Sequence, residues 1–116
     1  MQLSSTNYGT VVVLSPVGAL MGGELNEAIH NAVQDLLSDN NLLVVVDLSQ
    51  VPWINSSGIG TLMGCRTECA AKDGQLVLAC VNSKIMGLLN SLQLDKVLVC
   101  HSNLEEAVSL LGGTIN

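Results

Sequence analysis

The chain has 116 residues, of which 48% are hydrophobic and 2% aromatic, and it carries a net charge of −6. This length fits a single domain, and the acidic balance argues against a phosphate backbone as a ligand. The shortage of aromatic side chains argues against binding of single-stranded nucleic acid by base stacking. We therefore expect one globular domain over residues 1–116 that binds no nucleic acid.

The first elements along the chain are two short strands and a helix. Residues 2–8 are polar and alternate weakly, as in an exposed edge strand, and a turn at 8–10 leads into a β-branched run at 11–14 that Pro16 would end. Together they predict a hairpin. Residues 25–37 then place apolar side chains at the three-and-four spacing of one helix face, between Gly22-Gly23 and the turn residues 38–41.

Strands and helices alternate through the rest of the chain. Residues 42–46 and 75–80 are apolar runs, typical of strands covered on both faces. A short strand is expected at 97–100, and helices at 56–72, after Asn82-Ser83, and from Asn103 to Gly112-Gly113. For the first two of these helices the expected inner residues are Ile59, Leu62, Met63, Cys69 and Ala70, and then Ile85, Leu88, Leu89 and Leu92.

This order predicts an α/β fold with a mostly parallel central sheet, an antiparallel N-terminal edge strand and about four helices. The hydrophobic runs also predict which side chains form the core. The residues expected to be fully buried are Ile29, Val33, Val44, Val45, Leu62, Leu78 and Leu89.

No segment has the composition of a signal peptide or a membrane span. The first residues lack the basic and apolar regions of a signal peptide. Residues 48–65 carry no charge, but Pro52, Asn55 and several serines and glycines interrupt them, whereas a span needs predominantly apolar residues. We expect a cytoplasmic protein without membrane insertion.

The four cysteines, Cys65, Cys69, Cys80 and Cys100, form no CxxC pair and show no zinc-finger spacing. A helix would place Cys65 and Cys69 on one face, yet a zinc site needs further ligands nearby. We expect buried thiols in a reducing compartment, with no metal and no cofactor.

The most informative stretch is 47–60, which reads as a strand end, a loop and a helix start with two serines and two glycines. A helix N-terminus exposes unpaired N–H groups and the positive end of the dipole, so it accommodates anions. The same residues also fit a purely structural interpretation, in which a serine caps the helix and the glycines permit close packing. The physical chemistry leaves both interpretations open.

The stretch resembles the signature of the STAS domain, the sulphate transporter and anti-sigma factor antagonist family. The resemblance rests on Asp47-Leu48-Ser49, on the helix start from Asn55 through Ser56-Ser57-Gly58-Ile59 to Gly60, and on Gly18-Ala19-Leu20 before the first helix. The order of elements matches along nearly the whole chain. The resemblance implies a STAS-like single domain over residues 1–116.

In the antagonist branch of this family, the first serine of the pair is phosphorylated by a partner that is both anti-sigma factor and serine kinase. The unmodified protein binds that partner, and phosphorylation breaks the complex. Carried onto this chain, the resemblance implies phosphorylation at Ser56. It also implies supporting roles for Asp47, Asn55, Ser57, Gly58 and Gly60.

Two further residues are candidates for partner binding. Trp53 lies just before the serine pair, and Met21 belongs to the apolar loop 18–23, which could be exposed as part of a binding patch or tucked inward. The expected partner is the anti-sigma factor/serine-protein kinase, and a homodimer is left open.

Two positions depart from the family pattern and favour an alternative. Asn55 stands where an acidic residue is expected before the serine, and Met21 stands where the family often has Asp. Both departures bear on phosphorylation rather than on the fold. The alternative is a non-phosphorylated STAS subunit of a signalling scaffold or of a lipid transport assembly.

An enzyme is not expected. A serine nucleophile needs a base within reach and a third group that orients it, and His30 and His101 are the only histidines. His30 is expected to be a solvated helix residue, and no acidic partner for His101 is evident. The chain also lacks the Gly-x-Ser-x-Gly elbow, the phosphate loop and the dinucleotide fingerprint.

Overall fold

The computed structural model describes residues 2–113 and contains one five-stranded sheet with the strand order β1-β2-β3-β4-β5. The strands are β1 (Leu3–Tyr8), β2 (Val11–Pro16), β3 (Leu43–Asp47), β4 (Gln75–Ala79) and β5 (Cys100–His101). The helices are α1 (Glu24–Ser38), α2 (Ser56–Ala71), α3 (Ser83–Ser91) and α4 (Leu104–Leu110). β1 is an antiparallel edge strand and the other pairings are parallel, so the predicted α/β fold class is confirmed.

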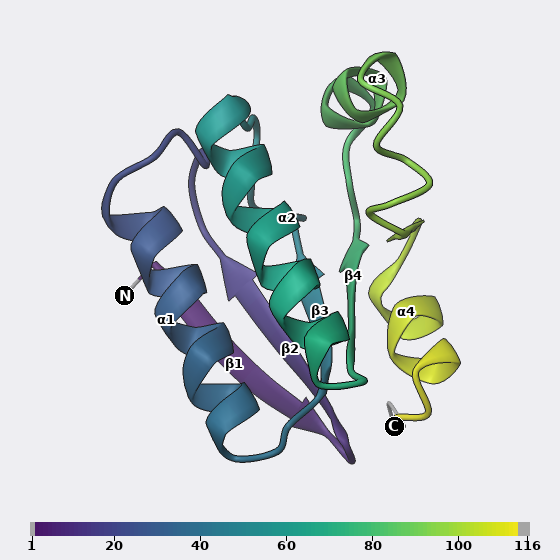
Figure 1. Ribbon diagram of the computed structural model, residues 1–116. Coiled ribbons are helices and arrows are strands. Elements are labelled where there is room, and N and C mark those ends of the chain that lie inside the picture. Colours follow the sequence, from purple (N-terminus) through teal and green to yellow (C-terminus); the bar gives the residue numbers. More distant parts are fainter. Residues whose placement is uncertain (1, 114–116) are drawn as a thin grey trace.

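Helices cover both faces of the sheet because the central strands are apolar on both sides. In β3, Val44 and Val46 face one cluster of buried side chains, whereas Val45 between them faces the other. α1, α2 and α3 pack on the first face and α4 on the second. Figure 1 shows α1 and α2 side by side across the sheet, with α4 near the C-terminal end of the chain.

The predicted core is confirmed. All seven side chains expected to be fully buried have a solvent-exposed fraction of 0%. Six of them belong to the cluster between the sheet and α1, α2 and α3, and Val45 belongs to the cluster on the opposite face, which α4 covers. Within residues 2–113, no helix combines the length and the apolar character that crossing a bilayer requires.

Two helix faces differ from the sequence prediction. In α2, Met63 is half-buried and packs against the core as expected, but Ala70 is exposed, and Cys65, which was not expected on the inner face, is fully buried. Leu62, Cys65 and Cys69 follow the helical repeat, and Ala70 lies one residue further round the helix, toward solvent. Leu92 is 51% exposed, because α3 ends at Ser91 and Leu92 is the C-cap that follows the last helical residue.

The last strand is shorter and later than predicted. The backbone N–H groups of Val97 and Leu98 both donate to the Leu94 carbonyl, at 3.0 and 2.8 Å, so these residues form a turn and not the start of a strand. Pairing with β4 begins only at Cys100. β4 itself ends at Ala79, because Cys80 has a φ of 59° and leaves the extended conformation.

Candidate functional site

The stretch singled out by the sequence lies at the carboxyl end of β3. The strand ends at Asp47, whose Oδ1 accepts a hydrogen bond of 2.9 Å from the Ser49 backbone N–H and so forms the turn that opens loop 48–55. The Asn82 side chain, at the start of α3, donates to the Pro52 carbonyl at 3.2 Å. The loop is therefore fixed at its start and in its middle before it enters α2.

Loop 17–23 lies directly beside the end of this loop. The Leu20 N–H donates to the Trp53 carbonyl at 3.0 Å, and the Asn55 N–H donates to the Leu20 carbonyl at 3.1 Å. This pairing forms an isolated parallel bridge between Leu20 and Ile54, whose side chains are both fully buried. The two segments on which the family resemblance rests are thus in direct contact.

Asn55 is the N-cap of α2. Its Oδ1 accepts a hydrogen bond of 3.0 Å from the Gly58 N–H, which satisfies one of the unpaired donors of the first turn. Its Nδ2 donates to the Met21 carbonyl at 3.2 Å. One side chain therefore caps the helix and ties loop 17–23 to it.

Of the two glycines at this helix start, one is required by packing. A Cβ on Gly58 would press against the Leu20 carbonyl oxygen and lie 2.9 Å from Leu20 Cβ and 3.2 Å from Ile54 Cβ. A Cβ on Gly60 would meet nothing within 4 Å. The bridge between loop 17–23 and residue 54 explains the need for glycine at 58 but not at 60.

Ser56 and Ser57 are the first two residues of α2, and both are exposed. The first turn contains no acidic residue, so no side-chain carboxylate offsets the positive end of the helix dipole there. The sequence interpretation of this stretch as a helix start marked by two serines agrees with the structure.

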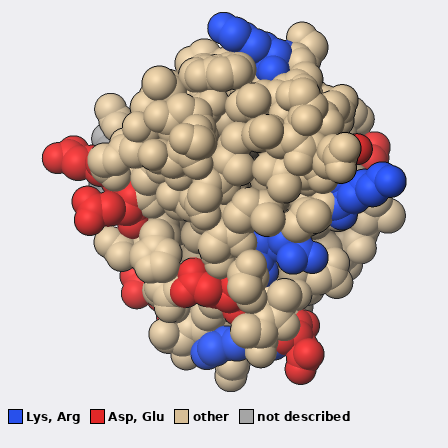
Figure 2. Space-filling model, turned by 45° about the horizontal axis from the view of Figure 1, so that its top comes forward, with Lys and Arg blue, Asp and Glu red and all other residues tan. Residues whose placement is uncertain are grey.

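The segments that form the surface around the serines contain no charged residue. Residues 17–23 and 48–64 contain no Asp, Glu, Lys or Arg. We call the exposed residues within 17–23 and 50–57 the neutral surface. Met21 and Val17 there are 51% and 48% exposed, although Leu20 between them is buried. Figure 2, which brings the top of Figure 1 forward, shows a broad uncharged area with most Lys, Arg, Asp and Glu side chains around and below it.

Trp53 lies at the edge of the neutral surface and is half-buried. The Lys84 ammonium, from the first turn of α3, lies 5.1 Å from the centroid of the indole ring, within the range of a cation–π interaction. Trp53 therefore presents part of its ring to solvent with a cation beside it.

A polar link that the sequence analysis missed joins the site to α1. Asn26 is 7% exposed; its Oδ1 accepts from the Gly22 N–H at 3.2 Å, and its Nδ2 donates to Thr61 Oγ1 at 3.1 Å. Thr61 Oγ1 in turn donates to the Ser57 carbonyl at 3.1 Å. The sequence did indicate that Asn26 faces inward, because it shares the helical spacing of the buried Ile29 and Val33.

The two histidines predicted to be outside any catalytic site both pair with glutamates. His101 Nδ1 lies 3.1 Å from Glu106 Oε1, an acidic partner that the sequence analysis did not find because it is supplied by α4. His30, which is exposed as predicted, lies 3.6 Å from Glu68 Oε1. Glu68 is about three helical turns, roughly 16 Å, beyond Ser57 along α2, so His30 does not approach the serine pair through this contact.

Comparison with known proteins identifies one family and several solved structures. A family model described as the STAS domain matches residues 2–107. An anti-sigma factor antagonist from Mycobacterium paratuberculosis is 20% identical, with a TM-score of 0.79 over 94% of this chain and 92% of that one. The Bacillus cell fate determinant SpoIIAA in its phosphorylated form is 17% identical, with a TM-score of 0.73 over 93% and 97%.

A third similar structure carries a different description. A sulfate transporter family protein from Wolinella succinogenes is 16% identical, with a TM-score of 0.70 over 88% of this chain and 84% of that one. At such low identities the three structures share a fold with this chain.

Proposed function

The chain belongs to the STAS domain family, and on this premise we propose that it acts as an anti-sigma factor antagonist. In this proposal it binds an anti-sigma factor that is also a serine kinase, and phosphorylation of Ser56 ends the binding. Two similar structures support this choice within the family, since one is described as an anti-sigma factor antagonist and the other is SpoIIAA in a phosphorylated form.

The observation that carries the proposal is the placement of Ser56. It is exposed, it is the first residue of α2, and it lies within the neutral surface. A phosphate there would be favoured by the helix N-terminus by roughly 0.3 to 2 kcal/mol, so it would leave the domain folded. In a partner interface, however, a desolvated phosphate without a basic counterpart costs several kcal/mol.

The remaining site residues would position Ser56. Asp47 orders the start of loop 48–55, Asn55 caps α2, and Gly58 allows the Leu20 backbone to approach the first turn. Ser57 would present its hydroxyl beside Ser56 without accepting the phosphate. Gly60 would keep the outer face of α2 free of side chains next to the serines, since it too is exposed.

Met21 and Trp53 would contact the partner. Both lie on the neutral surface, and an exposed methionine beside a partly exposed indole offers apolar area with adaptable shape. Because the surrounding segments are uncharged, a new phosphate would change the electrostatics of this surface more than it would on a charged one.

The test uses serine variants and the anti-sigma kinase of the same organism. Ser56→Asp is expected to keep the thermal midpoint of the wild type yet lose partner binding by tenfold or more, which corresponds to about 1.4 kcal/mol. Ser56→Ala is expected to bind but to gain no phosphate with ATP and kinase, as read by intact mass. Ser57→Ala is the matched control, and it should still accept one phosphate.

A second candidate function is that of a passive STAS subunit in a signalling scaffold or a lipid transport assembly. It is favoured by Asn55, which caps α2 but lacks the carboxylate expected before the serine, and by the likeness to a sulfate transporter family protein. If the kinase modifies Ser57 instead, or leaves both serines unmodified, the switch is wrong and this second function replaces it. Asn55→Asp is expected to raise the phosphorylation rate if the missing carboxylate limits it.

In either function the domain would act by binding and not by catalysis. Within residues 2–113, each histidine lies against a glutamate, and neither is hydrogen-bonded to a serine. A serine nucleophile would need such a base. The partner in the first function is a protein, and the chemistry of phosphate transfer would belong to that partner.

A further inference from the structure

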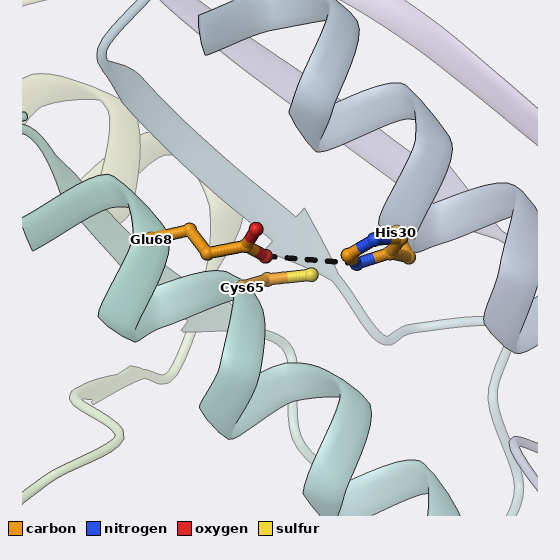
Figure 3. A group of neighbouring side chains, drawn as sticks. All are labelled: His30, Cys65 and Glu68. Carbon is orange, nitrogen blue, oxygen red and sulfur yellow. Dashed lines mark ion pairs between the residues drawn. The ribbon is translucent and has the colours of Figure 1, made fainter. Parts of the chain in front are cut away.

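A cluster of three metal-ligating side chains lies between α1 and α2, away from the serine pair. His30 comes from α1, and Cys65 and Glu68 come from successive turns of α2. One ligand atom of each lies within 4.8 Å of those of the other two. Figure 3 shows the three side chains pointing toward one another across the space between the helices.

The types and spacing of these ligands suit zinc. Zn²⁺ binds imidazole nitrogen, thiolate sulfur and carboxylate oxygen at about 2.0 to 2.3 Å in a tetrahedron, which places ligand atoms roughly 3.5 Å apart. His30 Nδ1 and Glu68 Oε1 are already 3.6 Å apart. Both side chains are partly exposed, and the Cys65 sulfur lies within 4.8 Å of a ligand atom of each.

We propose that His30, Cys65 and Glu68 bind one zinc-class divalent cation that links α1 to α2, with water as the fourth ligand. Two protein charges, the thiolate and the carboxylate, balance the charge of the cation. The imidazole then binds in its neutral form, as metal ligation requires. The proposal is independent of the function proposed for Ser56, because none of its ligands belongs to the neutral surface.

A neighbouring side chain orients the carboxylate. The Gln34 amide, one turn beyond His30 on α1, donates a hydrogen bond to Glu68 Oε2 and leaves Oε1 facing the imidazole. Outer contacts of this kind hold ligands in place at metal sites and contribute to affinity. The contact also comes from the same helix as His30, so the carboxylate is held against α1 even without a cation.

The cluster has an entry path. A groove of about 720 Å³ runs between α1 and α2, and His30 and Glu68 line it together with Gly60 and Gly64. The glycines leave its floor open on the α2 side. The Cys65 side chain is fully buried, so it would bind the cation from beneath while His30 and Glu68 bind from the groove.

The sequence analysis expected no metal, because it considered only Cys65 and Cys69 as a possible pair. Burial raises the pKa of Cys65 to about 12, with further contributions from Glu68 and Cys69. The thiol is therefore protonated without a cation, and cation binding would displace its proton. His30 lies on α1, so only the tertiary structure brings it to Cys65 and Glu68 of α2.

The test measures metal binding by the full chain after treatment with a chelator. Zinc chloride is titrated in competition with a chromophoric chelator, and cobalt chloride is added separately to look for a thiolate-to-cobalt charge-transfer band. Wild type is expected to bind one equivalent of either metal and to show the band. Cys65→Ala and His30→Gln are expected to lose at least about tenfold in zinc affinity, since even outer-shell changes cost that much.

Cys69→Ala is the matched control, because Cys69 is equally buried, lies one turn further along α2 and is not in the cluster. It should bind like wild type. Equal zinc binding by wild type, Cys65→Ala and His30→Gln, or the absence of a cobalt–thiolate band in wild type, would overturn the proposal. Loss of binding in Cys69→Ala would overturn the ligand assignment. His30→Gln keeps the test valid if Cys65→Ala fails to fold, because His30 is exposed.

Discussion

The Asn55 side chain makes two hydrogen bonds, of which an aspartate in its place could make only one. Its oxygen caps the first turn of α2 through the Gly58 N–H, and its amide nitrogen donates to the Met21 carbonyl. An aspartate would keep the cap but could not donate to a carbonyl at neutral pH. Asn55, in place of the acidic residue that the resemblance leads us to expect, therefore keeps the helix start capped and adds a link to loop 17–23, but it places no negative charge beside Ser56.

The packing at Gly58 predicts opposite effects for two neighbouring glycine substitutions. Gly58→Ala forces a methyl group against the Leu20 carbonyl and should destabilise the fold by about 1 to 3 kcal/mol. Gly60→Ala meets no atom within 4 Å and should stabilise it by about 0.5 to 1 kcal/mol, because alanine favours the helix. Urea unfolding measures both. Equal destabilisation by the two variants would contradict the close approach of loop 17–23 to α2.

Cys100 predicts a dependence of stability on alkaline pH. Burial, followed by the charge of Asp95, raises the pKa of this thiol from 9.0 to about 11. Below pH 9 both the folded and the unfolded chain keep the proton, so the contribution to stability is complete. Between about pH 9 and 11 the unfolded chain loses the proton first, and stability falls as pH rises.

The measurement is the urea midpoint at a series of pH values across this window. Cys100→Ala is the control, since it removes the thiol but leaves the other alkaline groups, and its midpoint should fall less steeply than that of the wild type. Parallel pH profiles for the two proteins would show that the folded state does not protect this thiol from ionisation.

At the scale of secondary-structure elements, α1 and α2 are joined by three polar contacts and border a common groove. Near the start of both helices, Asn26 connects the Gly22 backbone to Thr61. Further along, Glu68, about two turns beyond Thr61 on α2, contacts His30 and Gln34 of α1. These contacts bracket the groove at both ends, so the helix pair is held by directional bonds where few large apolar side chains meet.

The Asn26 link predicts a measurable coupling between loop 17–23 and the two helices. Asn26→Ala leaves the Gly22 N–H and the Thr61 hydroxyl without this partner in a mostly buried place and should cost about 1 to 3 kcal/mol. Asn31→Ala, an exposed change on the same helix, should stay within about 0.5 kcal/mol of the wild type. The free energy of unfolding in urea distinguishes the two variants. Similar values for both would show that the Asn26 hydrogen bonds do not stabilise the fold.

At the scale of the whole molecule, the net charge is −6, and no charged residue lies within segments 17–23 or 48–64. α1 and α4 carry many of the acidic residues, namely Glu24, Glu27, Asp35, Glu105 and Glu106. Charge on those helices favours solubility and gives little electrostatic attraction at the start of α2. A partner of the neutral surface would be held by apolar contact and backbone hydrogen bonds, an arrangement that a single phosphate can disturb.

The single tryptophan allows binding at this surface to be observed directly. Trp53 lies at the edge of the neutral surface with Lys84 stacked against it, so burial under a partner would change the environment of the indole. We expect its fluorescence to shift when the anti-sigma kinase is added, and no shift with Ser56→Asp. A partner that binds by an independent measurement but leaves the fluorescence unchanged would place Trp53 outside the interface.

Much of the fold could be predicted from local sequence patterns. The unbroken apolar run at 42–46 and the helical spacing of residues 25–37 required a buried parallel strand and a helix packed on it, and both are present. The prediction was wrong for apolar residues next to the end of an element, where the residue type alone suggested that the helix or strand included them. Leu92 and Val97 lie in turns because local hydrogen bonds and the end of α3 decide their positions.

At the candidate site, too, local features could be predicted from the sequence, whereas contacts between distant segments could not. The sequence by itself determined that Ser56 and Ser57 begin a helix after a buried strand, because capping residues and hydrophobic periodicity act over a few residues. Only the tertiary structure decided that Leu20 pairs with Ile54, that Gly58 must be a glycine, and that His30 meets Glu68 and Cys65. These contacts join segments distant in the chain, and the packing of α1 and α2 on one sheet brings them together.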